Sequence, residues 1–105
     1  MNPVDTFNLD IRSLSTFIAV LDEGSVSRAA VRLGVSQSAV SHTLDRLRQA
    51  LGDALFVKSG RGIVPTRYAL QAGPHIRQIL DDLHSLSSGP PFAPATAELT
   101  FTIAA

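Results

Sequence analysis

The hydrophobic pattern of this 105-residue chain is most regular between residues 25 and 51. Apolar residues recur there at spacings of three and four, the period of an α-helix, over residues 27–33 and again over residues 36–51. Gly34 between them takes a left-handed conformation at no steric cost, so it predicts an abrupt end to the first segment. Ser36 follows as a good N-cap for the second. The pattern therefore predicts two helices joined by a tight turn.

Three residues around this turn predict how the two helices pack. Ala30, four residues before Gly34, is small enough to let the helices approach, and Val40, six residues after it, points back into the same core. We expect Val35 to fill the groove between the helices. A small residue, a glycine and an apolar residue at these offsets are typical of a helix-turn-helix. The outward face of the second helix is polar and is expected to face a DNA major groove: Gln37, Ser38, Ser41, His42 and Arg48.

The flanking segments complete a winged fold. Asp10 is expected to cap a helix that runs to about Glu23 and whose apolar stripe includes Phe17 and Leu21, both expected in the core. Gly24 and Gly52 end helices. Residues 54–58 and 63–65 read as two short strands around the glycine-rich turn 59–62, which predicts a β-hairpin wing.

Lys58 and Arg61 stand in or beside the wing turn. They are either solvated turn charges or DNA contacts. A protruding arginine suits the negative potential of a narrow minor groove. The preceding helix-turn-helix therefore favours DNA contact.

The last long helix is predicted over residues 67–86, with Thr66 as its N-cap. Pro74 lacks an N–H group, so it is expected to kink the helix or divide it. His75 and His84 are read as surface or interface groups. Apolar residues at spacings of three and four form a seam that a second copy of the same helix is expected to cover. The seam residues are Ala69, Ala72, Ile76, Ile79, Leu83 and Leu86.

The net charge is zero, but its distribution is uneven. Residues 26–67 carry +5, whereas the first 25 residues carry −3 and residues 68–105 carry −2. A basic middle between acidic ends favours a DNA-binding protein. The chain has no cysteine, its three histidines do not stand at metal-ligand spacings, and no metal or cofactor is expected. It has no secretory signal and no apolar run that could span a membrane, so a cytoplasmic protein is expected.

Beyond a Ser/Gly/Pro linker at residues 87–91, Leu99, Phe101 and Ile103 alternate with other residues as in a β-strand that has no partner in the chain. The predicted fold is mainly α: a winged helix-turn-helix of three helices and a hairpin over residues 1–65, then a linker and dimerisation helix over residues 66–88. Residues 89–105 are expected to hold a hinge and the first strand of a second domain that the chain does not include.

Most of the chain resembles LysR-type transcriptional regulators. The matching stretches are LSTFIAVLDEGSVSRAAVRLGVSQSAVSHTLDRLRQALGDALFVKSGRGIVPT and, past the linker, LTFTIAA. The resemblance implies a winged helix-turn-helix, a long dimerising linker helix and a C-terminal effector-binding domain. It also implies that RNA polymerase is a possible partner of the longer protein.

The resemblance implies that residues of the second helix of the motif contact DNA. Ser36 is expected at a phosphate. Gln37 corresponds to a family glutamine that reads base edges, and Ser41 corresponds to the serine of the family's ALS motif. Ser38 replaces the usual proline, so a contact with a thymine methyl gives way to a hydroxyl contact. His42 stands where arginine is frequent, which weakens an expected bidentate contact with guanine.

The resemblance also assigns the remaining polar residues. Arg46, Arg48 and Lys58 match phosphate or scaffold positions rather than base readers. Arg61 matches the wing arginine that reaches the minor groove, and Thr66 matches a threonine near the DNA backbone at the start of the linker helix.

Three classes of function are compatible with a fold of this kind. The first is a dimer that binds an inverted repeat in double-stranded DNA. The second is a protein-interaction module, which would favour apolar residues at Ser38, Ser41 and His42. The third is an enzyme, for which the sequence offers no nucleophile, carboxylate pair, phosphate loop or metal cluster. The polar helix face and the basic middle favour the first.

Overall fold

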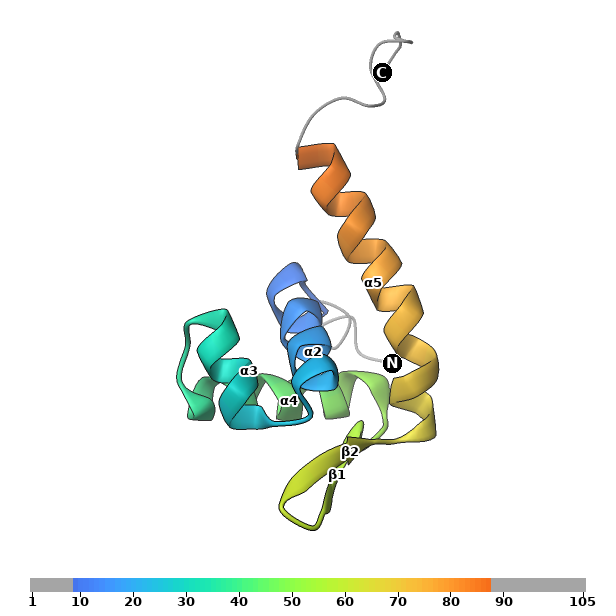
Figure 1. Cartoon of the computed structure of the whole chain (residues 1–105). Helices are drawn as coiled ribbons and strands as arrows, with labels where there is room; N and C mark the ends of the chain where they lie inside the picture. Colours follow the sequence, from blue (N-terminus) through green and yellow to red (C-terminus); the bar gives the residue numbers. More distant parts are fainter. Residues whose placement is uncertain (1–8, 88–105) are drawn as a thin grey trace, which may run out of the picture.

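The computed structural model describes residues 9–87 as four helices and one hairpin (Figure 1). The elements, in chain order, are α2 (Ile11–Glu23), α3 (Val26–Leu33), α4 (Gln37–Leu51), β1 (Phe56–Ser59), β2 (Gly62–Pro65) and α5 (Arg67–Ser87). This is the mainly helical winged architecture that the sequence predicts. The expected hinge and final strand lie outside the described residues.

The helix ends follow from local sequence. Asp10, Ser25 and Ser36 each accept a hydrogen bond from the backbone N–H three residues later, which caps α2, α3 and α4. At the other end, Gly34 has φ 71° and ψ 33°, and its conformation stops α3. Glycine ends α2 and α4 in the same way. The predicted caps at Asp10 and Ser36 and the three glycine stops are confirmed, while the cap at Ser25 starts α3 one residue earlier than expected.

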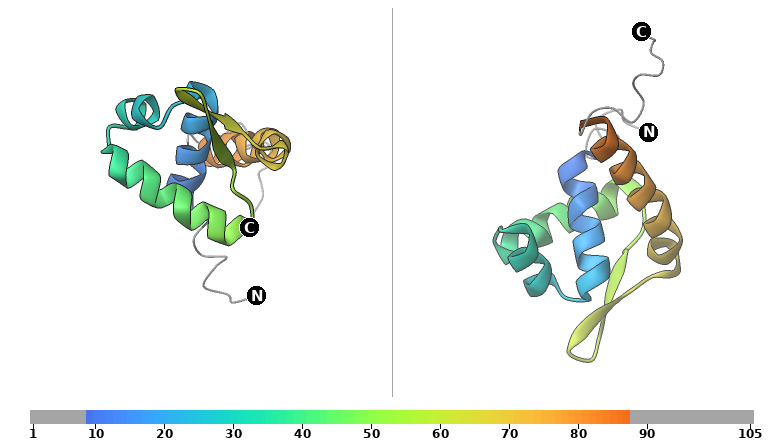
Figure 2. Two further views of the ribbon diagram at one scale, coloured as in Figure 1. Left: turned by 90° about the horizontal axis from the view of Figure 1, so that it is seen from below. Right: turned by 45° about the horizontal axis from the view of Figure 1, so that its top comes forward.

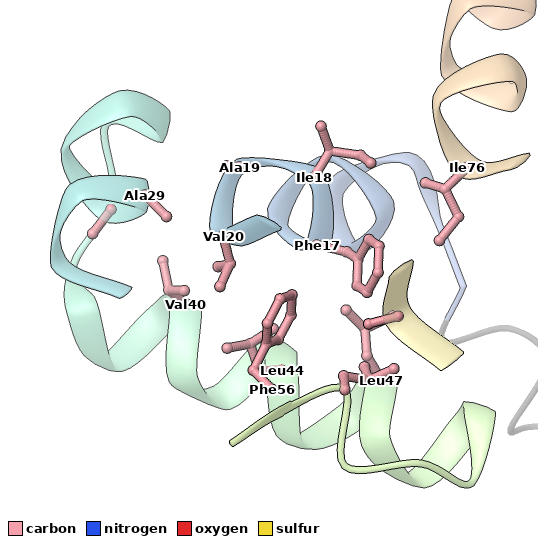
Figure 3. Close-up of a cluster of buried hydrophobic side chains, with 13 residues drawn as sticks. Phe17, Ile18, Ala19, Val20, Ala29, Val40, Leu44, Leu47, Phe56 and Ile76 are labelled. Atoms are coloured by element: carbon pink, nitrogen blue, oxygen red, sulfur yellow. The ribbon is translucent and has the colours of Figure 1, made fainter. Parts of the chain in front are cut away.

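The core lies where α2 contacts the other three helices. Phe17 of α2 and Leu44 and Leu47 of α4 point toward one another and toward Phe56 of β1 (Figure 3). The rings of Phe17 and Phe56 lie 5.4 Å apart between centroids. Burying aromatic rings stabilises the fold and attaches the base of the wing to the helices.

Several packing predictions can be compared with this core. Ala30, Val40 and Phe17 are buried as expected. Leu21 is only partly buried against the core. The prediction for Val35 is wrong, because its side chain is 46% exposed beside the turn instead of filling the groove between α3 and α4.

The first strand of the wing begins two residues later than predicted, both strands reach one residue further into the turn, and the entry to the wing is unusual. Its strands pair antiparallel, with Phe56 opposite Pro65 and Ser59 opposite Gly62. Leu55 lies before the first strand, with φ 66°, inside a γ-turn that the Phe56 N–H closes on the Ala54 carbonyl at 2.7 Å. A leucine in the left-handed region is strained, and full burial of its side chain compensates.

Asp53 and Thr66 join the two ends of the wing. The Asp53 carboxylate accepts hydrogen bonds from the Leu55 N–H and from the Thr66 hydroxyl, both at 2.7 Å. The Thr66 N–H donates to the Leu55 carbonyl at 2.9 Å. The chain therefore enters and leaves the wing through one hydrogen-bonded junction, which holds the wing in place relative to α4 and α5.

The helix α5 is continuous from Arg67 to Ser87, so Pro74 does not divide it. Thr66 caps it as predicted, because its hydroxyl accepts from the Ala69 N–H at 3.1 Å. The neighbouring Gly73 has a packing role. A Cβ atom at Gly73 would lie 2.8 Å from Cδ2 of Leu21, so the missing side chain lets α5 approach α2 closely.

The predicted seam of α5 is split between two environments. Ala69 and Ile76 are buried in the chain's own core, and Ala72 packs against it. Ile79, Leu83 and Leu86 are exposed. Ala69 and Ile76, which were expected at the dimer interface, therefore pack in the chain's own core, although Ile76 also lines a hollow at the surface of α5. The exposed residues of the seam begin at Ile79.

Candidate nucleic-acid interface

One face of α4 carries most of the predicted contact residues. Val40, Leu44 and Leu47 turn into the core, and the helical period therefore directs the intervening polar side chains outward. The predicted contact residues exposed here are Ser36, Gln37, Ser38, Ser41, His42 and Arg46. The structure thus brings these residues onto one accessible surface.

The first residues of α4 are ordered by the cap. The Ser36 hydroxyl accepts from the Ala39 N–H at 3.1 Å and lies 3.4 Å from the Ser38 hydroxyl. One lone pair of Ser36 is therefore used in holding the helix end. The predicted phosphate contact at this position depends on its hydroxyl proton and on the helix N-terminus, which favours anions.

Arg48 has a structural role, one of the two alternatives that the sequence left open. Its Nε donates to the Ala54 carbonyl at 2.8 Å, and its Nη1 donates to Asp45 at 2.8 Å. These bonds connect α4 to the segment that enters the wing. Arg48 therefore sets the angle between the helix and the hairpin.

Lys58 and Arg61 remain exposed on the wing, and no ion pair within residues 9–87 involves either of them. Arg61 lies in the turn between Gly60, with φ 59°, and Gly62. The hairpin and α4 lie at the same end of the molecule, and α5 runs away from them (Figures 1 and 2). A helix and a cationic tip therefore face the same side.

The Thr66 side chain, unlike those of Lys58 and Arg61, forms hydrogen bonds within residues 9–87 of the protein. Its hydroxyl donates to Asp53 and accepts from the Ala69 N–H. Both directions of hydrogen bonding are thus in use. The structure therefore supports a role in joining the wing to α5, and the DNA-backbone contact expected of Thr66 would require its proton to leave Asp53.

Two aspartates of α2 and its cap have lowered pKa values. Hydrogen bonds from Ser13 lower the pKa of Asp10, and the nearby Arg46 and Arg12 lower it further. A hydrogen bond from Arg77 lowers the pKa of Asp22, and Arg32 adds to the effect. Asp22 thereby connects α2 to both α3 and α5.

Arg12 is a basic residue near this surface that the sequence pattern did not single out. It lines a hollow between α2 and α4 together with His42 and Arg46. In the sequence it stands thirty residues before His42, inside an acidic segment. Only the packing of α2 against α4 brings it to the interface.

Within residues 9–87, no group of three or more His, Cys, Asp or Glu side chains could hold a metal ion. None of the helices in this part of the chain is long and apolar enough to cross a membrane.

A family model for bacterial regulatory helix-turn-helix proteins of the lysR family matches residues 11–70. The chain belongs to the LysR family. The matched residues run from the start of α2 to the first turn of α5, so they contain both the helix-turn-helix and the wing.

Curated relatives agree with this LysR-family assignment. The transcriptional regulator LeuO of Escherichia coli (strain K12) is 42% identical over 93 residues, which are 89% of this chain and 30% of LeuO. The transcriptional activator NahR of Pseudomonas putida is 39% identical over 98 residues, 92% of this chain and 33% of NahR. The chain thus spans about a third of each relative. Their names support the prediction of a regulator rather than an enzyme.

Solved structures of the LysR family share the fold. The CbnR DNA-binding domain in complex with DNA matches with a TM-score of 0.72 and 32% identity, covering 76% of this chain and 92% of that one. The probable transcriptional regulator PA0477 from Pseudomonas aeruginosa matches with a TM-score of 0.72 and 35% identity, covering 90% of this chain and 32% of that one. The winged architecture is therefore that of LysR-type DNA-binding domains.

Proposed function

We propose that this LysR-family chain binds double-stranded DNA in a sequence-specific manner as a homodimer and regulates transcription. The observation that carries the proposal is the exposed polar face of α4 beside a wing whose two cations have no acidic partner within residues 9–87. The likeness to a LysR-type domain solved with DNA supports it.

The proposed readout has two parts. The helix α4 enters the major groove, where Gln37, Ser41 and His42 reach base edges and Ser38 offers a hydroxyl. The wing places Arg61 in the adjacent minor groove, while Lys58 and Arg46 contact phosphates. The base contacts select a sequence, and the cations add affinity that depends on salt.

The proposed dimer uses the exposed part of α5. Ile79, Leu83 and Leu86 present apolar surface there. Two hollows adjoin it: one of about 630 Å³, lined by Leu51, Tyr68 and Ile79 among others, and one of about 530 Å³ between Ile11 and Leu83. A second α5 laid along this surface would bury the apolar side chains, which favours association. The two copies of α4 would then face successive turns of an inverted repeat.

The wider assignment follows the family. Residues 1–65 form the DNA-binding unit, residues 66–88 the linker helix, and residues 89–105 the start of an effector-binding domain in a longer, cytoplasmic protein. RNA polymerase is the proposed partner of that longer protein. These divisions rest on the LysR membership and on the sequence pattern.

Selection of bound duplexes from a random DNA pool tests the proposal. We expect an inverted repeat whose half-sites are about one helical turn, or a multiple of it, apart. Absence of any enriched sequence would reject specific binding, and enrichment of isolated half-sites would reject the dimer.

The variant His42→Arg sharpens this experiment. It should shift the preference at one base pair of each half-site toward guanine, because arginine makes a bidentate contact there. Gln78→Arg is the matched control, since it adds the same charge at an exposed position on α5 that lines neither hollow, and it should leave the selected sequence unchanged.

A further inference from the structure

The flank of α4 that faces away from the wing carries a second basic surface. Arg48 marks the wing side, because it donates to the Ala54 carbonyl. Ala39, Thr43 and Arg46 follow one another at helical spacing along the opposite side, half a turn around the helix. They line a hollow of about 470 Å³ between α4 and the first turns of α2.

The hollow contains groups suited to an anion. Arg12 projects into its lining from the first turn of α2, and Arg46 comes from α4. Within residues 9–87 no ion pair involves Arg12, and no side chain or backbone group hydrogen-bonds the hydroxyl of Thr43. Two guanidinium groups and a hydroxyl can together bind phosphate oxygens, which accept charge-assisted hydrogen bonds.

One acidic group lies nearby, and its role is local. The Asp10 carboxylate accepts from the Ser13 N–H at 2.8 Å and so caps α2. Its lowered pKa reflects these hydrogen bonds first and the charges of Arg46 and Arg12 after them. Asp10 stays ionised at neutral pH, and its carboxylate is engaged in capping α2.

The position of the hollow identifies the ligand. His42 belongs both to the outward face of α4 and to the lining of the hollow, so the two surfaces are continuous. An α-helix with its side chains is about 10–12 Å wide, and the major groove is about 12 Å wide. A helix that enters this groove therefore has a sugar-phosphate backbone along each flank. The wing serves one flank, which leaves the hollow for the other strand.

We infer that Arg12, with Arg46 and Thr43, binds a DNA phosphate on the side of α4 opposite the wing. This inference rests on the proposed DNA binding and adds a contact that positions the helix without reading bases. Arg12 thereby anchors α2 to the duplex, so that α4 is held between two phosphate contacts.

The test measures the affinity of the whole chain for its selected duplex and for an unrelated duplex over a range of salt concentrations. Arg12→Gln should weaken binding about tenfold on both duplexes, because a phosphate contact carries no sequence information. The slope of log affinity against log salt should become shallower by about 0.9, the value for one phosphate. Arg12→Lys should retain most of the slope. Arg12 is exposed, so these variants should fold.

Asp82→Asn is the charge control, since it changes the net charge by one unit at an exposed position on α5 and should leave the slope unchanged. Duplexes with one neutral methylphosphonate locate the contact: the position that weakens the wild-type chain should have no further effect on Arg12→Gln. Equal affinity and slope for Arg12→Gln and wild type would overturn this inference alone. A wild-type chain without sequence preference would instead overturn the proposed function.

A titration with inorganic phosphate at constant ionic strength separates the two sources of the anion. We expect no saturable change in the amide resonances of Arg12 and Thr43. Saturable phosphate binding, together with DNA affinity that Arg12→Gln does not alter, would assign the hollow to a free anion and overturn the DNA contact.

Discussion

Asp22→Asn should loosen the connection between the helix-turn-helix and α5. Both nitrogens of the Arg77 fork donate to the two oxygens of Asp22, and Arg32 Nη1 lies 3.1 Å from Asp22 Oδ2. Asp22 thus binds one arginine from α5 and one from α3. Asparagine keeps the size of the side chain but removes the charge and one acceptor. Both ion pairs are weakened together.

The expected magnitude follows from the exposure of the pairs. The Asp22 side chain is 29% exposed, and Arg32 and Arg77 are 44% and 45% exposed. Pairs in such surroundings contribute about 0.2–1 kcal/mol each, so Asp22→Asn should lower the free energy of unfolding by about 1 kcal/mol at neutral pH. For a domain of this size, that loss corresponds to a fall in Tm of roughly 4–8 °C.

The lowered pKa of Asp22 determines how its contribution to the free energy of unfolding depends on pH. The pKa of Asp22 is lowered in the folded chain, so its stabilising contribution is complete above the unfolded value of about 3.9 and is lost as the pH falls through the folded value. The difference between wild type and Asp22→Asn should therefore be constant near neutral pH and should shrink below about pH 4.

Urea denaturation followed by circular dichroism at several pH values measures this difference. Glu23→Gln is the control, because the Glu23 carboxylate has a single contact with Arg32 at 3.5 Å, and its loss should cost less. Equal stability of Asp22→Asn and wild type at pH 7, or a difference that persists unchanged under acid conditions, would refute the assignment of Asp22 as the link between these helices.

Three further substitutions test the wing, the core and the dimer. Arg61→Ala should weaken DNA binding and reduce its dependence on the A·T content of the flanking sequence; unchanged affinity at physiological salt in a binding titration would remove the wing from the mechanism. Phe56→Ala should lower the free energy of unfolding by about 3–5 kcal/mol, because it empties a buried site beside Phe17, whereas a comparable loss in exposed Val57→Ala would contradict that reasoning. Ile79→Asp should convert the proposed dimer to a monomer in light scattering, while Leu70→Asp, on the opposite flank of α5, should not; a dimer of unchanged mass for Ile79→Asp would exclude this surface.

Much of the fold could be predicted because it depends on neighbours in the chain. The caps at Asp10 and Ser36 and the stop at Gly34 each involve residues within a few positions of one another, so the sequence contains all of the interacting groups. Taken in chain order, such local signals predict the helix-turn-helix and then the wing. The exposed face of α4 follows from the helical period once its apolar positions are known.

The structure departs from the sequence pattern where packing and backbone geometry override the preference of a residue type. Val35 is apolar and stands beside the turn, yet it is 46% exposed. Leu55 adopts a left-handed conformation that its sequence does not favour, because Asp53 and Thr66 hold its backbone and the core accepts its side chain. Pro74 remains inside a continuous helix, which excludes a division, one of the two effects expected of it, and Gly73 beside it serves the contact with Leu21.

The sequence by itself determined the elements, their order, the polar face of α4 and the membership of the LysR family. The tertiary structure decided which neighbouring element packs against each helix face and which faces stay exposed. A helical repeat indicates that Ala69, Ile76 and Ile79 share a stripe, but it carries no information on whether that stripe meets α2 or a second copy. The packing of α2 against α4 and α5 buries the first two, leaves Ile79 exposed, and brings Arg12 beside Arg46. These outcomes depend on distances across the fold, which local propensity does not specify.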